Sequence, residues 1–158
     1  MRKLGLAVAA AIASLVLAAP AFAQTTVDVS ARFVEGVPQQ FGCTAPGEFF
    51  TLCGTGTVVP YGRATETIQF GAGCGGTCDL RTIYLAQGTL VLDETFSSPS
   101  CPGACQSHGL GQSSGTLTDV IVSGTGIFEG ATGTLTGTVQ GAGASTKITL
   151  SGTITLTG

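Results

Sequence analysis

The chain has 158 residues, of which 25 are glycine, and its nine acidic and six basic residues give a formal net charge of −3 at pH 7. This balance excludes a basic nucleic-acid-binding protein, because such proteins neutralise phosphates with clustered Lys and Arg. Glycine at more than twice its usual ~7% excludes a long helical bundle.

The N-terminal segment has the three-part layout of a secretory signal peptide. A basic start, Met1-Arg2-Lys3, precedes an almost wholly apolar run from Leu4 to Ala19 and the small-x-small cleavage signal Ala21-Phe22-Ala23. The apolar run is shorter than the about 20 residues that span a membrane. We therefore expect cleavage after Ala23 and a secreted or periplasmic protein that is not inserted in a membrane. Removing these 23 of the 158 residues leaves 135, which form one domain over 24–158 with four basic and nine acidic residues.

Apolar residues of the remaining chain recur with a period of two, which predicts strands rather than helices. In the first strand, Thr25 to Phe33, residues 27, 29, 31 and 33 share an apolar face. Further strands are predicted at 63–70, 80–87, 89–96, 116–123, 127–129, 132–140 and 145–157, with a hairpin turning near Gln87-Gly88. Gly152 interrupts the apolar face of the last strand, which predicts a bend or a bulge there. Seven or eight short antiparallel strands predict a sandwich or a barrel.

Six cysteines behind a signal peptide predict three disulfides, because exported proteins fold in an oxidising compartment. They are Cys43, Cys53, Cys74, Cys78, Cys101 and Cys105. The first two bracket a Pro/Gly loop and are expected partners. The other four form two C-x-x-x-C units, which either close their own small loops or cross-link to each other. These four cysteines with His108 also have the spacing of a tetrahedral metal site, but oxidation on export favours disulfides and no metal.

Two long segments, 38–53 and 97–114, are predicted loops rich in Pro, Gly and Ser. The first contains Phe49 and Phe50, which are candidate exposed anchors for a protein partner. His108 and its neighbouring serines lie in the second loop, without the Gly-x-Ser-x-Gly elbow of a serine hydrolase. Thr-x-Thr pairs recur in three of the predicted strands, 116–123, 132–140 and 145–157. Outward threonines are expected from β-propensity alone, so an ice-binding protein is not indicated.

The segment Ser123 to Gly137 contains the pattern Gly124-x-Gly126-x-Phe128-x-Gly130-Ala131-x-Gly133. This pattern resembles the strand–turn–strand signature of the dirigent and allene oxide cyclase-like barrels. The resemblance implies an antiparallel up-and-down β-barrel of about eight strands, often assembled into dimers or trimers. Allene oxide cyclases close a ring in an unsaturated fatty-acid epoxide, and dirigent proteins steer the coupling of phenolic radicals. Neither family's catalytic residues can be placed on this sequence, and its cysteine loops depart from both families.

The residues of this motif can also be interpreted from their physical properties, without reference to a protein family. Gly130 and Gly133 permit a positive φ around a tight turn. Phe128 is the one large apolar anchor of the segment, so we expect it to plug the barrel interior.

Three charged residues share strand faces with apolar residues, and we expect their side chains to point inward. They are Glu66, Arg81 and Glu94. A charge inside a barrel is costly unless it is paired. Arg81 would neutralise one carboxylate and leave the other with the raised pKa that a general acid or base needs. Alternatively, both glutamates lie near strand ends in water. Asp93 should point outward, and Asp119 is left unassigned.

These patterns predict an exported, disulfide-bonded β-barrel that binds a small apolar ligand or presents a stable surface. The first alternative is a cofactor-free isomerase or cyclase in which Glu66, Glu94 and Arg81 form the catalytic site. The second is a structural or partner-binding protein that uses the two cysteine loops. The expected partners are a small apolar ligand, a further copy of the chain or another protein, but not a nucleic acid.

Overall fold

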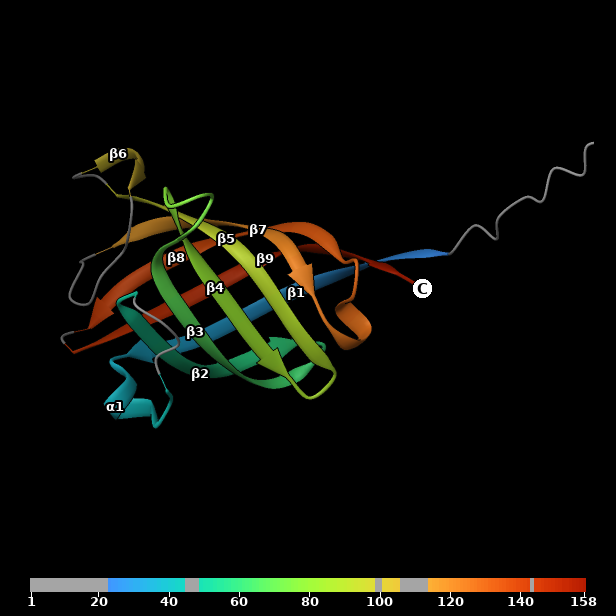
Figure 1. Ribbon diagram of the computed structural model, residues 1–158, viewed down its shortest axis with the longest axis horizontal. Helices are drawn as coiled ribbons and strands as arrows, with labels where there is room; N and C mark the ends of the chain where they lie inside the picture. Colours follow the sequence, from blue (N-terminus) through green and yellow to red (C-terminus); the bar gives the residue numbers. More distant parts are fainter. Residues whose placement is uncertain (1–22, 45–48, 99–100, 106–113, 143) are drawn as a thin grey trace, which may run out of the picture.

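The computed structural model describes residues 23–44, 49–98, 101–105, 114–142 and 144–158, with the side chains of 101–105 and 142 left out. Most of this part of the chain is strand (Figure 1). The strands are β1 (Gln24–Gly36), β2 (Thr51–Val59), β3 (Gly62–Gly73), β4 (Cys78–Leu85), β5 (Gly88–Ser98), β6 (Cys101–Cys105), β7 (Gly115–Gly124), β8 (Thr132–Ala142) and β9 (Ser145–Thr157). Two short helical turns are α1 (Pro38–Phe41) and η1 (Gly126–Phe128).

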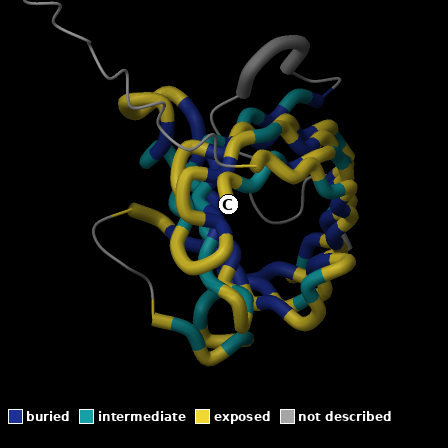
Figure 2. Tube along the Cα trace, turned by 90° about the vertical axis from the view of Figure 1, so that its right-hand side faces the viewer, coloured by how far each residue is buried: buried dark blue, intermediate teal, exposed yellow. Residues whose placement is uncertain are grey.

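Eight of the strands close into an antiparallel barrel, as predicted. Their order is β4-β3-β2-β1-β9-β8-β7-β5, and β5 pairs back onto β4 to complete the ring, while β6 pairs only with the end of β5. Figure 2 looks along the barrel from the end that carries the C-terminus and shows the closed ring. Strands that follow one another in sequence lie side by side, so the barrel is of the up-and-down type.

Strand β2 corrects the sequence analysis, which predicted a loop over 38–53 and no strand between that loop and residue 63. The inward positions of β2 are Leu52, Gly54, Gly56 and Val58, since they pair with buried positions of β1 and β3. Two glycines at these positions remove the apolar alternation on which the prediction of strands depends. The short α1 and β6 also lie within the predicted loops.

Two further expectations near the C-terminus are also corrected. Residues 127–129 are not a strand, because the helical turn η1 spans Gly126–Phe128. Gly126 begins this turn and Gly130 follows it, with positive φ values of 63° and 69°. Of the bend or bulge predicted at Gly152, the bulge is excluded, because β9 pairs through this residue with both β1 and β8 without a register shift. A Cβ at Gly152 would overlap the carbonyl oxygen of Thr134, so glycine allows the close approach of β8.

Two disulfides lie at the same end of the barrel as α1 and β6, on the left of Figure 1. Cys43–Cys53 joins the predicted partners, with Cα atoms 6.4 Å apart. Cys74–Cys78 closes its own loop, with Cα atoms 5.4 Å apart, so this unit is not cross-linked to the second one. The predicted pair Cys101 and Cys105, with His108, falls outside the described side chains. These disulfides are compatible with an oxidising, extracellular compartment.

Among the described residues, one group of three side chains has the spacing of a metal site, and it contains the Cys74–Cys78 disulfide. One ligand atom each of Cys74, Cys78 and Asp93 lie within 4.8 Å of one another. Both sulfur atoms are joined in the disulfide, so they are not thiolate ligands. Asp93, expected to point outward, is half-buried beside them.

The barrel interior divides into an apolar part and a charged part. Apolar side chains such as Phe33, Leu135, Ile148 and Phe128 pack into one core cluster. Phe128 has no exposed area and contacts Tyr61 edge-to-face, with ring centroids 4.9 Å apart, so it plugs the interior as predicted. The charged part lies at the cysteine-bearing end. No helix in the described part of the chain is long and apolar enough to cross a membrane.

Candidate functional site

Six charged side chains lie inside the barrel at its cysteine-bearing end, each no more than 1% exposed. They are Glu35 of β1, Glu66 of β3, Asp79 and Arg81 of β4, Glu94 of β5 and Asp119 of β7, which we call the acid cluster. Strand register explains two subgroups. Gly54 of β2 pairs with Glu35 on one side and Glu66 on the other. Glu94 pairs with Asp79 and with Asp119.

Arg81 sits between the two subgroups and contacts four carboxyl groups. Its Nη1 donates a hydrogen bond to Glu35 Oε1 at 2.9 Å and another to Glu66 Oε2. Its Nε donates to Glu94 Oε2 at 2.7 Å, its Nη2 contacts the same oxygen, and Nε lies 3.6 Å from Asp119 Oδ2. One guanidinium therefore bridges two carboxyl pairs, Glu35 with Glu66 and Glu94 with Asp119.

One positive charge cannot balance the five buried acidic groups of the cluster, so we expect some of them to hold protons. Burial raises the pKa of Glu66 well above its ordinary 4.5; Arg81 opposes this shift and the charge of Glu35 adds to it. The pKa of Asp119 is raised by burial and by the charge of Glu94. Burial disfavours the charged form of Arg81, but the surrounding carboxylates outweigh this and raise its pKa. Two acids that share a low-dielectric site cannot both ionise cheaply.

The structure brings together all three residues that strand parity placed inside, Glu66, Arg81 and Glu94. The alternative, that the two glutamates lie in water at a strand end, is wrong because each is 1% exposed. The unassigned Asp119 joins them. Sequence reasoning missed Glu35 and Asp79, which lie two positions after and one before the predicted ends of their strands.

The acid cluster has no direct access to solvent. The side chains of Arg81, Glu35, Glu66, Glu94 and Asp119 have 0% exposed area. Residue Glu66 also forms part of the wall of a pocket of about 330 Å³ between α1, the Cys43–Cys53 loop and the outer faces of β2 and β3. A substrate would therefore reach the carboxyl groups only if this end opened, and the catalytic role of the three residues stays a prediction.

Gly54 leaves the space that the Glu35/Glu66 pair occupies. A Cβ at this position would lie 2.5 Å from Glu66 Oε1 and 3.1 Å from Glu35 Cγ. We expect Gly54→Ala to lower the free energy of unfolding by about 1–3 kcal/mol, as for other overpacked interiors. Urea denaturation measures this loss. Thr55→Ala, its outward-facing neighbour, is the control and should change stability by less than about 0.5 kcal/mol; equal effects would show that the pair does not need this space.

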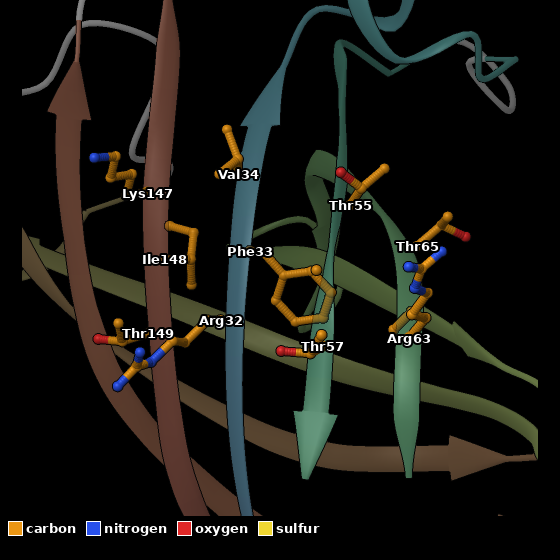
Figure 3. A pocket seen from close by; sticks show the side chains of 12 residues that line it. Arg32, Phe33, Val34, Thr55, Thr57, Arg63, Thr65, Lys147, Ile148 and Thr149 are labelled. Atoms are coloured by element: carbon orange, nitrogen blue, oxygen red, sulfur yellow. The ribbon is translucent and has the colours of Figure 1, made fainter.

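A second candidate site is a groove of about 700 Å³ on the outer wall, across β9, β1, β2 and β3. Within the described residues, Arg32, Arg63 and Lys147 are the only exposed basic side chains, and all three line this groove. Figure 3 shows Lys147 and Arg32 on one side and Arg63 on the other, with Phe33 and Val34 between them. Val34 is 40% exposed. We call this site the basic groove.

The basic groove shares lining residues with two other hollows of the outer wall. A hollow of about 710 Å³ across β1, β9, β8 and β7 shares Arg32 and Thr149 with it and is lined mainly by Thr and Ser. Within that hollow Thr138 and Thr149 hydrogen-bond at 2.8 Å. The pocket under the Cys43–Cys53 loop shares Thr55 and Thr65 with the groove. The three hollows therefore adjoin one another round part of the barrel wall.

Sequence analysis did not predict the basic groove. Arg32 and Arg63 are neighbours because both pair with Thr57 of β2, the strand that was missed. Lys147 joins them because β9, the last strand, pairs with β1, the first. Strand alternation places Arg32 on the face opposite residues 27, 29, 31 and 33, but the relative register of the strands, which brings Arg32, Arg63 and Lys147 together, does not follow from the sequence.

The predicted anchors of the first cysteine loop are exposed. Phe49 and Phe50 are 48% and 59% exposed, and Phe50 stacks on Phe70 with ring centroids 5.4 Å apart. They lie at the cysteine-bearing end, next to β2.

Comparison with models of known protein families and with curated proteins finds no match. The likeness to the dirigent and allene oxide cyclase-like barrels is therefore shown only as far as the eight-stranded antiparallel barrel. Within the motif, Gly130 and Gly133 have the positive φ values expected of them, 69° and 150°.

Proposed function

We propose that this protein is an exported binding module that takes a small amphiphilic anion, such as a long-chain carboxylate or alkyl sulfate, in the basic groove. The observation that carries the proposal is that the three exposed cations of the described chain line one hollow. Its volume of about 700 Å³ lies within the ordinary range for ligand sites. Export is expected from the N-terminal segment and agrees with the two disulfides.

The composition of the groove favours an amphiphile over a simple anion. Exposed Val34 and the methyl groups of the exposed threonines that line the groove supply an apolar surface between the cations, whereas Phe33 and Ile148 are 2% and 1% exposed and border the groove only from the barrel interior. An alkyl chain gains roughly 0.8 kcal/mol per buried CH₂, and the cations fix the position of its charged end. This modifies the expected apolar ligand in two respects: its place is the outer wall, and it carries a negative charge.

The proposal is tested by titrating decyl sulfate, below its micelle concentration, into the mature oxidised protein and measuring heat. We expect the combined change Arg32→Gln, Arg63→Gln and Lys147→Gln to weaken binding by about 3- to 150-fold, since exposed ion pairs contribute roughly 0.2–1 kcal/mol each. Undetectable binding to the unchanged protein, or equal binding to the variant, would contradict the proposal.

A control separates the position of the charges from net charge. Val122→Glu, Ile127→Glu and Thr132→Glu lower the net charge by the same three units at exposed positions outside the groove. This variant should bind decyl sulfate within about threefold of the unchanged protein, because screening weakens charges beyond about 8–10 Å.

A partner-binding surface is the second candidate function, and exposed Phe49 and Phe50 favour it. Aromatic side chains dominate the energetics of many protein interfaces. Changing both to Ser should leave the midpoint of urea unfolding nearly unchanged. Unfolding of the domain by these changes would show that they stabilise the fold instead.

A further inference from the structure

We infer that the acid cluster makes the basic groove pH-sensitive, so that the protein holds its anion at acidic pH and releases it as the pH rises. This inference rests on the proposed function and adds its regulation. The groove and the cluster are the outer and inner faces of one stretch of barrel wall.

Strand alternation places the two sites back to back. Groove residues Val34 and Thr65 directly precede cluster residues Glu35 and Glu66. Successive residues of a strand point to opposite faces, so the two glutamates lie behind the groove.

The strands on either side continue this arrangement. Thr55 of the groove follows Gly54, which pairs with both glutamates. Lys147 of the groove follows buried Thr146, which pairs with Glu35. The Glu35/Glu66 pair is therefore the part of the cluster nearest the groove.

The charged groups around the Glu35/Glu66 pair fall into two sets, one inside the barrel and one on its outer wall. Inside, Arg81 contacts both glutamates, and Glu94 and Asp119 lie on its far side. Asp79 also lies inside and accepts a hydrogen bond from the Gly71 amide at 2.9 Å. Outside are the three groove cations. Gly54 and Thr146, beside the pair, carry no charge, so loss of a proton from the pair changes the charge directly behind the bound anion.

One added negative charge on the Glu35/Glu66 pair is large enough to change the affinity of the groove for an anion across the barrel wall. Two unit charges about 10 Å apart interact strongly enough, at an effective dielectric constant of 20–40, to change affinity by about 4- to 15-fold. Burial keeps the pKa of Glu66 well above its ordinary value, so its proton leaves above the usual range for a carboxyl group. By linkage, binding of an anion must draw protons into the cluster to the same extent.

The experiment measures the affinity for decyl sulfate between pH 5 and 8.5, a range over which the sulfate ester of the probe keeps its charge. We expect binding to weaken by about 4- to 15-fold or more as the pH rises. The double variant Glu35→Gln and Glu66→Gln should keep the acid-pH affinity and lose most of this dependence. Glu129→Gln, which removes an exposed carboxyl group outside the groove, is the matched control and should keep the full dependence.

The outcomes separate this inference from the proposed function. Undetectable binding at every pH contradicts the proposed function. Binding that is independent of pH, or that stays equally dependent in the double variant, overturns only the inference. If the double variant does not fold, proton uptake by the unchanged protein decides: heats measured in buffers of different ionisation enthalpy should show a net uptake of protons on binding near pH 7. Zero uptake would overturn the inference.

Discussion

Replacing Arg81 with methionine is expected to lower the free energy of unfolding at pH 7 by about 3–5 kcal/mol, which is the usual effect of removing one partner of a buried ion pair. Arg81 has no exposed area and is the only cation in contact with Glu35, Glu66 and Glu94 among the described residues. Methionine is apolar and of similar length, so the packing is roughly kept and the lost interaction is mainly electrostatic. Guanidinium denaturation of the oxidised protein measures the effect.

The matched control is Arg63→Met, the same change at an exposed position of the next strand. It should change the free energy of unfolding by no more than about 0.5 kcal/mol. Arg81→Lys should fall between the two, because an ammonium group has the charge but not the forked geometry that bridges two carboxyl pairs. If the methionine variants at both positions are equally stable, the cluster is neutral without Arg81 and the ion pairs do not stabilise the fold.

Much of this cluster follows from strand parity in the sequence. Glu66, Arg81 and Glu94 each share a face with apolar residues, and all three are buried. Parity did not identify Glu35, because the predicted strand ended at residue 33 and Glu35 continues the inward face of β1 beyond it. Asp119 stayed ambiguous because apolar Val120 and Val122 compete for the same inner face, although they are 45% and 50% exposed.

What parity cannot supply is the order of strands round the ring. The basic groove depends on the pairing of the first strand with the last, a contact between residues more than a hundred positions apart. It also depends on β2, whose inward Gly54 and Gly56 give no periodic signal. Gly54 also makes room for the interior charges, because a Cβ there would overlap the Glu35/Glu66 pair. Gly54 therefore both hides β2 from sequence analysis and provides the space that the acid cluster requires.

Stability of the folded protein is expected to fall as the pH rises from about 5 to 9, opposite to the usual trend for proteins whose carboxylates are paired. Burial raises the pKa of Glu66 above its ordinary 4.5 and that of Asp119 above its ordinary 3.8. Between the unfolded and the folded pKa, the folded state holds protons that the unfolded state has lost. The free energy of unfolding then decreases with pH, by about 1.4 kcal/mol per pH unit for each such proton. The stabilisation is complete below the unfolded pKa and is lost as the pH rises through the folded one.

Denaturation midpoints at pH 5, 7 and 8.5 measure this trend, and Glu66→Gln identifies its source. Glutamine has nearly the shape of the protonated acid and cannot ionise, so the variant should have a flatter profile and exceed the unchanged protein in stability at pH 8.5. Glu129→Gln should keep the original slope, because Glu129 is exposed. A stability that rises with pH would mean that attraction to Arg81 outweighs burial and that the carboxyl groups are ionised. In that case the charge behind the groove would be fixed, and an anion bound there would not be released as the pH rises.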